Sequence, residues 1–193
     1  MKIAIMGGTF NPIHYGHLIS AEEVRDRFGF DSIIFVPSAR PPHKGRRNII
    51  DPEHRYKMAI LSTADNPYFQ VSRIELDRMG PSYSIDTFRQ FQVQYGSETQ
   101  IAWIIGADSL IEITIWKDFD ELLNICHFIT TTRPNYDISS VPENIRRRVK
   151  FFEITAVDIS ATEIRRRIRE NRTIKYLVHK SAEEYIYEHN LYK

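Results

Sequence analysis

The sequence predicts an α/β fold in which a doubly wound, mostly parallel sheet carries helices on both faces. Short apolar segments of strand length alternate along the chain with segments of helical pattern. Polar or glycine-containing motifs directly follow several of the apolar segments, as ligand sites at the carboxyl ends of parallel strands do. The chain has 193 residues, about the size of one domain, so residues 1–193 are expected to form a single domain.

The first half of the chain supplies three strands and three helices of this pattern. Residues 2–6 are apolar without alternation, as expected of a buried strand. A helix over 17–28 ends at Gly29, which suits a left-handed C-terminal cap. Asp51 and Pro52 begin the next helix as N-cap and first helical residue. The other expected elements here are strands at 32–36 and 69–76, and a helix at 84–95 that is capped by Ser84.

The second half continues the alternation. Residues 101–105 form a strongly apolar strand that leads directly into Gly106. Two capping boxes, one beginning at Ser160 and one at Ser181, predict closing helices from about residue 160 onward. The remaining expected elements are a helix at 118–124 and strands at 128–132 and 150–154.

Composition narrows the class of protein. The formal net charge is +1, so no global field attracts nucleic acid or a membrane surface. No apolar segment is long enough to span a bilayer, and the first residues are typical of a strand rather than a signal peptide. The single cysteine, Cys126, excludes an intramolecular disulfide. We expect a cytoplasmic protein, and the sequence leaves assembly into a homo-oligomer open.

The segment 7–17, Gly-Gly-Thr-Phe-Asn-Pro-Ile-His-Tyr-Gly-His, follows the first strand. Gly7 and Gly8 allow a sharp turn and a close approach to a ligand. His14 and His17 are three residues apart at the beginning of a helix, so both imidazoles face one side. Free amides at a helix N-terminus attract anions. The segment therefore predicts a site for phosphate, most simply that of a nucleoside triphosphate.

This segment also has simpler interpretations. A glycine pair after a strand is often only a turn. A His-x-x-His pair can bind a metal, but zinc needs a third or fourth ligand, and Cys126 lies in an unrelated apolar stretch. We therefore predict no protein-bound metal site.

A second motif begins the helix after the last strand. Ser160 can cap that helix, Thr162 adds a hydroxyl in its first turn, and Arg165 can reach back toward the same end. Hydroxyls, free amides and a guanidinium together suit phosphate oxygens. The alternative is an ordinary capping box with a solvated basic face, and Arg166, Arg167 and Arg169 fit that alternative better.

Together, the two motifs resemble the signatures of the HIGH-motif nucleotidyltransferases, which are a glycine-rich loop followed by His-x-Gly-His and a closing Ser-x-Thr-x-x-Arg. The resemblance implies a Rossmann-like fold. It also implies transfer of a nucleotidyl group from a nucleoside triphosphate to a phosphate or a similar acceptor.

The middle of the chain resembles one branch of that superfamily, the bacterial nicotinate-nucleotide adenylyltransferases. The resemblance covers Met1 to about Tyr187 and rests on four segments in order: Pro-Pro-His-Lys at 41–44, Pro-Ser-Tyr-Ser at 81–84, Gly-Ala-Asp at 106–108, and Trp116. It implies that ATP and nicotinate mononucleotide are converted, with Mg²⁺, into nicotinate adenine dinucleotide (deamido-NAD) and pyrophosphate, a step in NAD biosynthesis.

The resemblance also implies roles for individual residues. The residues implied to be catalytic are His14, His17 and Arg165. The residues implied to contact ATP are Gly7, Gly8, Thr9, Phe10, Gly106, Asp108, Ser160 and Thr162. The residues implied to contact nicotinate mononucleotide are Lys44 at its phosphate, Trp116 stacked on its ring, and Ser84 and Thr87 beside that ring.

Three positions depart from the family pattern: Asn11 replaces an aspartate, Ser84 a threonine, and Lys117 an aromatic residue. The last departure puts a second ring contact in doubt. Trp116 also fits a core anchor, Asp108 an N-cap, and Lys44 a solvated loop lysine.

The expected mechanism needs no strong general base, because a nucleotide phosphate is already anionic. Positioning and neutralisation of charge suffice. His17 is expected to contact the α-phosphate and His14 to hold the phosphates, and Mg²⁺ is expected to arrive on ATP. The amides after Ser84 favour a ring carboxylate, whereas Asp86 opposes it.

Two other functions are compatible with parts of the sequence. Another small-molecule nucleotidyltransferase, such as pantetheine-phosphate adenylyltransferase or a cytidylyltransferase, would share both motifs but would not require Pro-Pro-His-Lys at 41–44 or Trp116. A nucleic-acid-binding module could use the basic residues at 146–150 and 165–169, but the low net charge disfavours it.

Overall fold

The computed structural model describes residues 1–42 and 49–193, and a parallel sheet forms its centre. The order of the six strands in these residues is β3-β2-β1-β4-β5-β6, and each neighbouring pair is parallel. This confirms the predicted Rossmann-like α/β class. The strands are β1 (Lys2–Gly8), β2 (Ser32–Pro37), β3 (Phe69–Val71), β4 (Gln100–Gly106), β5 (His127–Thr132) and β6 (Val149–Glu153).

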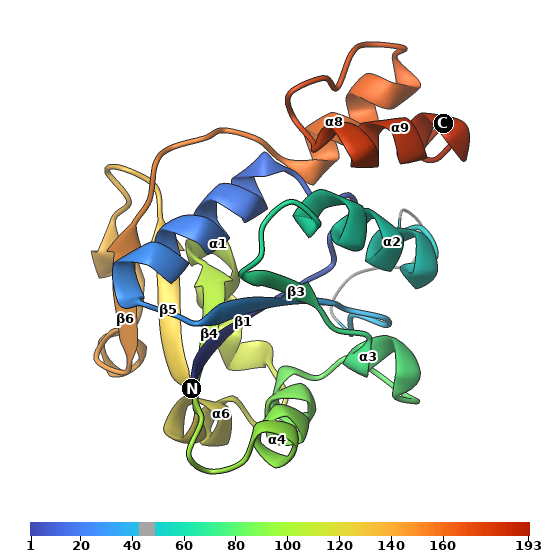
Figure 1. Ribbon diagram of the computed structural model, residues 1–193. Helices are drawn as coiled ribbons and strands as arrows, with labels where there is room; N and C mark the ends of the chain where they lie inside the picture. Colours follow the sequence, from blue (N-terminus) through green and yellow to red (C-terminus); the bar gives the residue numbers. More distant parts are fainter. Residues whose placement is uncertain (43–48) are drawn as a thin grey trace.

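Helices cover both faces of the sheet (Figure 1). Successive side chains of β1 point to opposite faces, so Ala4 and Met6 join one buried cluster while Ile3 and Ile5 join the other. The first cluster lies under α1 (Tyr15–Phe28), α2 (Pro52–Thr63), α8 (Ala161–Arg169) and α9 (Lys180–Glu188). The second lies under α4 (Ser84–Tyr95), α5 (Ala107–Ile111), α6 (Phe119–Ile125) and α7 (Glu143–Arg146).

Several helix ends follow the predicted chemistry. Gly29 has a φ of 61° after α1, and its amide donates to the carbonyls of Arg25 and Asp26. Asp51 accepts the amide of Glu53 at 2.8 Å before α2. Ser160 accepts the amide of Glu163 at 3.2 Å before α8. Each cap satisfies backbone groups that a helix end otherwise leaves without a partner.

The strand predicted at 69–76 is wrong beyond Val71. β3 ends there, and the short helix α3 (Ile74–Asp77) follows. The register pairs Phe35 of β2 with Val71, so continued pairing would soon reach Pro37 at the end of β2. Proline has no amide to donate, and the ladder therefore stops.

Two predicted N-caps are also wrong. Tyr83 is the N-cap of α4, and Ser84 is its first helical residue. At α9 the cap is His179, whose Nδ1 accepts the amide of Ser181 at 3.3 Å. The sequence also gave no sign of the brief elements α3, α5 and α7, or of the 3₁₀ turns at Ile113–Ile115 and Ile138–Ser140, because one turn has no visible period.

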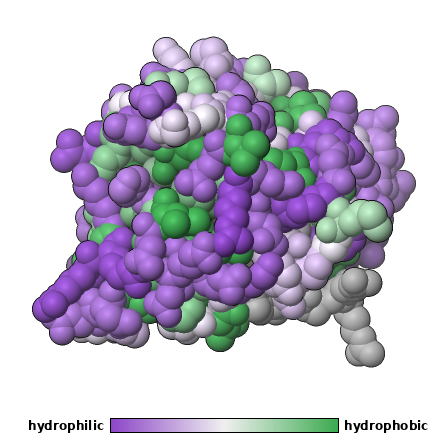
Figure 2. All heavy atoms as spheres, turned by 90° about the horizontal axis from the view of Figure 1, so that it is seen from below, coloured by the Kyte–Doolittle hydropathy of each residue, from purple (hydrophilic) through white to green (hydrophobic). Residues whose placement is uncertain are grey.

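In the part of the chain that the structure describes, no helix is long and apolar enough to cross a membrane. Figure 2 shows the face formed around α4 and α6, where hydrophobic residues lie in small groups among hydrophilic ones. Small, scattered apolar areas of this kind are normal on a protein surface.

Candidate active site

The loop after β1 bends at Phe10, two residues later than the predicted turn. β1 continues through Gly8, and Phe10 has a φ of 46°, which residues other than glycine rarely adopt. The buried Phe10 ring lies 6.0 Å from that of Phe35 and meets the imidazole of His17 edge-on at 5.0 Å. A Cβ on Gly8 would lie only 2.9 Å from the Phe10 ring, so glycine lets the ring fold back under the loop.

The two histidines meet at the start of α1, as predicted. Their ring centroids are 3.7 Å apart and their planes differ by 28°. The backbone amide of His14 donates to Nδ1 of His17 at 3.2 Å, so a neutral His17 carries its proton on Nε2. A Cβ on Gly16 would lie 3.1 Å from Nδ1 of His14. The glycine of the His-x-Gly-His motif therefore makes room for the first imidazole.

His14 is neutral in the free protein near pH 7. Its side chain is 7% exposed, and its Nδ1 is buried without a hydrogen-bond partner among the described residues. Burial, and secondarily the nearby Arg133 guanidinium, lower the pKa of His14 to about 4. Positive charge at this site must therefore come from other groups.

The closing helix α8 is tied directly to the loop after β1. Nη1 of Arg165 donates to the carbonyl of Asn11 at 2.7 Å, and Nη2 donates to the hydroxyl of Thr162 at 3.2 Å. Burial lowers the pKa of Arg165, but a guanidinium keeps its charge at neutral pH. Arg165 thus places a cation beside the helix start, as its motif predicted.

Sequence reasoning missed Arg55, which holds the loop after β1 through a hydrogen bond to the carbonyl of Thr9. This side chain of α2 is fully buried. It donates to three carbonyls, those of Thr9 at 2.6 Å, Ile50 at 3.1 Å and Ala39 at 3.4 Å. Hydrogen bonds of this kind satisfy a buried cation only where the fold brings distant carbonyls together, so no local sequence signal could have identified it.

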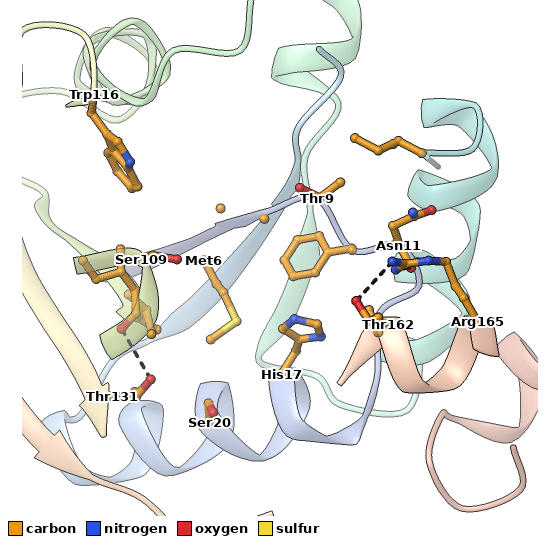
Figure 3. A pocket seen from close by; sticks show the side chains of 18 residues that line it. Met6, Thr9, Asn11, His17, Ser20, Ser109, Trp116, Thr131, Thr162 and Arg165 are labelled. Atoms are coloured by element: carbon orange, nitrogen blue, oxygen red, sulfur yellow. Dashed lines mark hydrogen bonds between the residues drawn. The ribbon is translucent and has the colours of Figure 1, made fainter. Parts of the chain in front are cut away.

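These contacts surround a hollow that we call the α1–α8 pocket (Figure 3). The starts of α1 and α8 border it, and both helix starts carry partial positive charge. The predicted site residues that line it are Gly7, Gly8, Thr9, Phe10, His17, Gly106, Trp116, Thr162 and Arg165. Ser109, directly after the Gly-Ala-Asp segment, also lines it, although sequence reasoning assigned it no role.

A second hollow, lined by His14, Arg133, Tyr136 and residues of the segment before α8, continues the first along β5. The two share His17, Ser20, Gly106 and Thr131. The combined space lies at the carboxyl ends of β1, β4 and β5, where open parallel sheets bind ligands.

A third hollow, which we call the α4 pocket, lies on the other side of the loop after β1. Gly7, Gly8, Thr9 and Trp116 line both it and the α1–α8 pocket. Its remaining wall includes Ser84, as predicted, and five further residues from the segments that carry the resemblance or beside them, namely Pro41, Pro42, Ser82, Tyr83 and Lys117. Ser38, Glu75 and Trp103 complete the wall, and sequence reasoning did not single them out. Two ligands could therefore meet across the glycine-rich loop.

Four predicted residues either line none of these hollows or lie outside the description. Ser160 caps α8 with its hydroxyl, as predicted, and lines none of the three hollows. Thr87 is fully buried behind the α4 pocket, and its hydroxyl donates to Glu75 at 2.6 Å. Asp108 lies within α5, but its side chain is outside the description. Lys44 lies outside the described residues altogether.

The fold and the paired pockets define a nucleotidyltransferase-like protein, and residues 5–167 match the cytidylyltransferase-like family. The chain is also 48% identical to a probable nicotinate-nucleotide adenylyltransferase of Moorella thermoacetica, covering 100% of this chain and 92% of the relative. A protein of the same name from Thermoanaerobacter sp. is 46% identical, covering 100% and 95%. The chain therefore belongs to the cytidylyltransferase-like family and, within it, to the nicotinate-nucleotide adenylyltransferases.

A solved structure supports the fold independently. Plasmodium falciparum nicotinic acid mononucleotide adenylyltransferase, complexed with NaAD, superposes with a TM-score of 0.82 at 20% identity, covering 99% of this chain and 97% of that one. At this identity the likeness speaks for the fold alone.

Proposed function

We propose that this enzyme transfers the adenylyl group of ATP to nicotinate mononucleotide, giving nicotinate adenine dinucleotide and pyrophosphate in NAD biosynthesis. The observation that carries the proposal is the pair of pockets that share the glycine-rich loop and Trp116. The names of the relatives point the same way. ATP would occupy the α1–α8 pocket and the hollow along β5, and the acceptor would occupy the α4 pocket.

In the reaction, a phosphate oxygen of the mononucleotide attacks the α-phosphorus of ATP. The new bond from oxygen to phosphorus forms as the bond between the α-phosphorus and the bridging oxygen breaks, and pyrophosphate leaves with that electron pair. The attacking oxygen is already anionic, so the protein needs to hold both phosphates in line and stabilise the charge that develops.

Three residues of the α1–α8 pocket and of the hollow beside it would do this work. His17 would donate from Nε2 to the α-phosphate, since its Nδ1 already accepts a backbone amide. Arg165 and the amides at the start of α8 would hold the β- and γ-phosphates. His14, neutral and stacked on His17, would hold the phosphates during binding and keep the second imidazole in place.

On the acceptor side, Trp116 would offer its flat face to the pyridine ring and Ser84 would lie beside the ring. Lys44 would meet the phosphate of the mononucleotide, and Asp108 would hold ribose. Thr87 would act indirectly, by fixing the buried carboxyl of Glu75.

Mg²⁺ is part of the proposal. The polar side chains that line the α1–α8 pocket carry hydroxyls, an amide, an imidazole and a guanidinium, and no carboxylate is among the described lining residues, which suits a magnesium ion that the triphosphate itself carries. Bound in this way, Mg²⁺ supplies charge neutralisation on the phosphate oxygens.

The other expectations concern partners and location. Several cations of the basic segments pair within the chain, Arg147 with Glu143, Arg148 with Asp120, and Arg166 with Glu163, which favours a protein that does not bind nucleic acid. We infer that the enzyme acts in the cytoplasm, and the homo-oligomer that the sequence leaves open can be tested by light scattering.

The decisive assay incubates the purified chain with MgATP and a panel of acceptors, and measures pyrophosphate and dinucleotide separately. Nicotinate mononucleotide should support the fastest release of pyrophosphate, in step with the dinucleotide. Faster reaction with phosphopantetheine, or with CTP as donor, would contradict the proposal in favour of a related nucleotidyltransferase. Omission of Mg²⁺ tests the requirement for the metal.

A further inference from the structure

Lys117 in the wall of the α4 pocket forms an ion pair that sequence reasoning did not foresee. Nζ of Lys117 lies 3.2 Å from both carboxylate oxygens of Asp86, which is 31 residues away in the sequence. Lys117 also lies over the ring of Tyr83, with Nζ 4.9 Å from the centroid. Both Lys117 and Tyr83 line the pocket beside Trp116.

This pair stands at the start of α4. Tyr83 is the N-cap, so the amides of the first helical residues point out of the helix toward the region of Ser84. A negatively charged group gains charge-assisted hydrogen bonds there, and a neutral group gains less. Asp86 lies in the same first turn, and its unpaired charge would repel an anion.

Lys117 removes that repulsion. Lys117 and Asp86 together carry no net charge, so the partial positive charge of the helix start remains. The Lys117 side chain is 41% exposed and that of Asp86 is 31% exposed, so water screens the pair and the effect is moderate.

A second carboxyl, that of Glu75, also bears on how well the α4 pocket accepts an anion. Glu75 is 5% exposed and lines the α4 pocket, and its second oxygen, Oε2, has no hydrogen-bond partner among the described residues. Desolvation raises the pKa of Glu75. Nη2 of Arg78 lies 3.9 Å from Oε1 of Glu75, and this cation offsets the repulsion that an ionised Glu75 would exert on an anionic ligand.

We propose that Lys117 is a specificity-determining residue, which neutralises Asp86 so that the start of α4 accepts a pyridine ring bearing a carboxylate in preference to one bearing a carboxamide. The inference rests on the proposed adenylyl transfer and names the group that selects its acceptor. Stacking on Trp116 cannot make this distinction, because both rings are flat and aromatic.

The test compares kcat/KM for nicotinate and nicotinamide mononucleotides at saturating MgATP. Lys117→Met should lower the ratio of the two values about fivefold, the size of a partly exposed charge interaction. Lys117→Arg keeps the charge and should keep the ratio. Asp86→Asn should raise the ratio, and the double variant Lys117→Met with Asp86→Asn should return it close to wild type.

Arg147 and Glu143 provide the control, because they form an exposed ion pair that lines none of the pockets described. Arg147→Met should leave the ratio unchanged. A ratio for Lys117→Met within twofold of wild type would overturn the inference, as would a wild-type preference for the nicotinamide nucleotide. A wild-type enzyme that adenylylates neither acceptor would instead contradict the proposed function.

Discussion

The two pockets that share the loop after β1 are built in different ways. The α1–α8 pocket is held by buried contacts, such as Arg55 on the carbonyl of Thr9 and Arg165 on the carbonyl of Asn11. The wall of the α4 pocket includes the partly exposed Lys117, which pairs with Asp86 at the start of α4. Groups that must meet a transition state need fixed geometry, whereas groups that choose between substrates can lie at a solvated edge. Substitutions in the first pocket should therefore change the rate, and those in the second the choice of acceptor.

The largest expected effect comes from His17→Ala, which removes the donor that we place at the α-phosphate. Loss of one preorganised donor at a developing charge typically costs on the order of 100–1000-fold in turnover. ATP binding should weaken far less, and steady-state kinetics with direct ATP titration separates the two. His127→Ala is the matched control, because His127 is exposed at the first residue of β5. Turnover of His17→Ala within a few-fold of wild type would refute the assignment.

The second prediction concerns stability, because the rigid pocket contains a neutral, buried histidine. The pKa of His14 is about 4 in the folded protein, below that of an ordinary histidine, so the unfolded chain binds the proton first as the pH falls. The free energy of unfolding should therefore decrease between about pH 6.5 and pH 4. From this residue alone, the decrease between pH 7 and pH 5 is about 2 kcal/mol.

Denaturant unfolding of wild type and His14→Asn at the two pH values checks this expectation. Asparagine is a favourable N-cap and does not titrate, so the variant should lose about 2 kcal/mol less than wild type over the same range. Equal losses in the two proteins would mean that His14 is already accessible to protons.

The difference between the pockets also explains which features could be predicted from the sequence. The segments 7–17 and 160–165 were identified because each motif is local and uses special residue types. Arg55 and the pair of Lys117 and Asp86 join residues that are distant along the chain, and no local pattern records such contacts. The same limit applies to β3, whose length depends on Pro37 in the neighbouring strand. The parallel arrangement of the sheet could be predicted from the alternation of strand and helix patterns, because parallel neighbours need a crossover connection that is usually a helix.

The third prediction is that Arg165→Lys lowers kcat/KM for ATP about tenfold. Lysine keeps the charge but cannot make both hydrogen bonds, to Asn11 and to Thr162, while it also faces phosphate. Arg169→Lys, at an exposed position one turn later in α8, is the matched control and should retain wild-type kinetics. An unchanged value for Arg165→Lys would mean that only the charge matters. The two hydrogen bonds by which Arg165 joins α8 to the loop after β1 would then have no role in catalysis.

The smallest expected effect on activity is that of Cys126→Ser, because Cys126 lines neither pocket. Cys126 is 4% exposed within the cluster under α6, and burial raises the pKa of its thiol, so the side chain remains an uncharged thiol at neutral pH. Serine would bury a hydroxyl and should lower the free energy of unfolding by about 1–3 kcal/mol. Cys126→Ala also loses the sulfur but adds no polar group, so the difference between the two variants measures the cost of the buried hydroxyl. The kinetics of the folded fraction, measured with circular dichroism on the same samples, should match wild type for both variants. An inactive but fully folded Cys126→Ser would show that residues outside the two pockets take part in the chemistry. The proposal that one pocket sets the rate and the other the choice of acceptor would then be wrong.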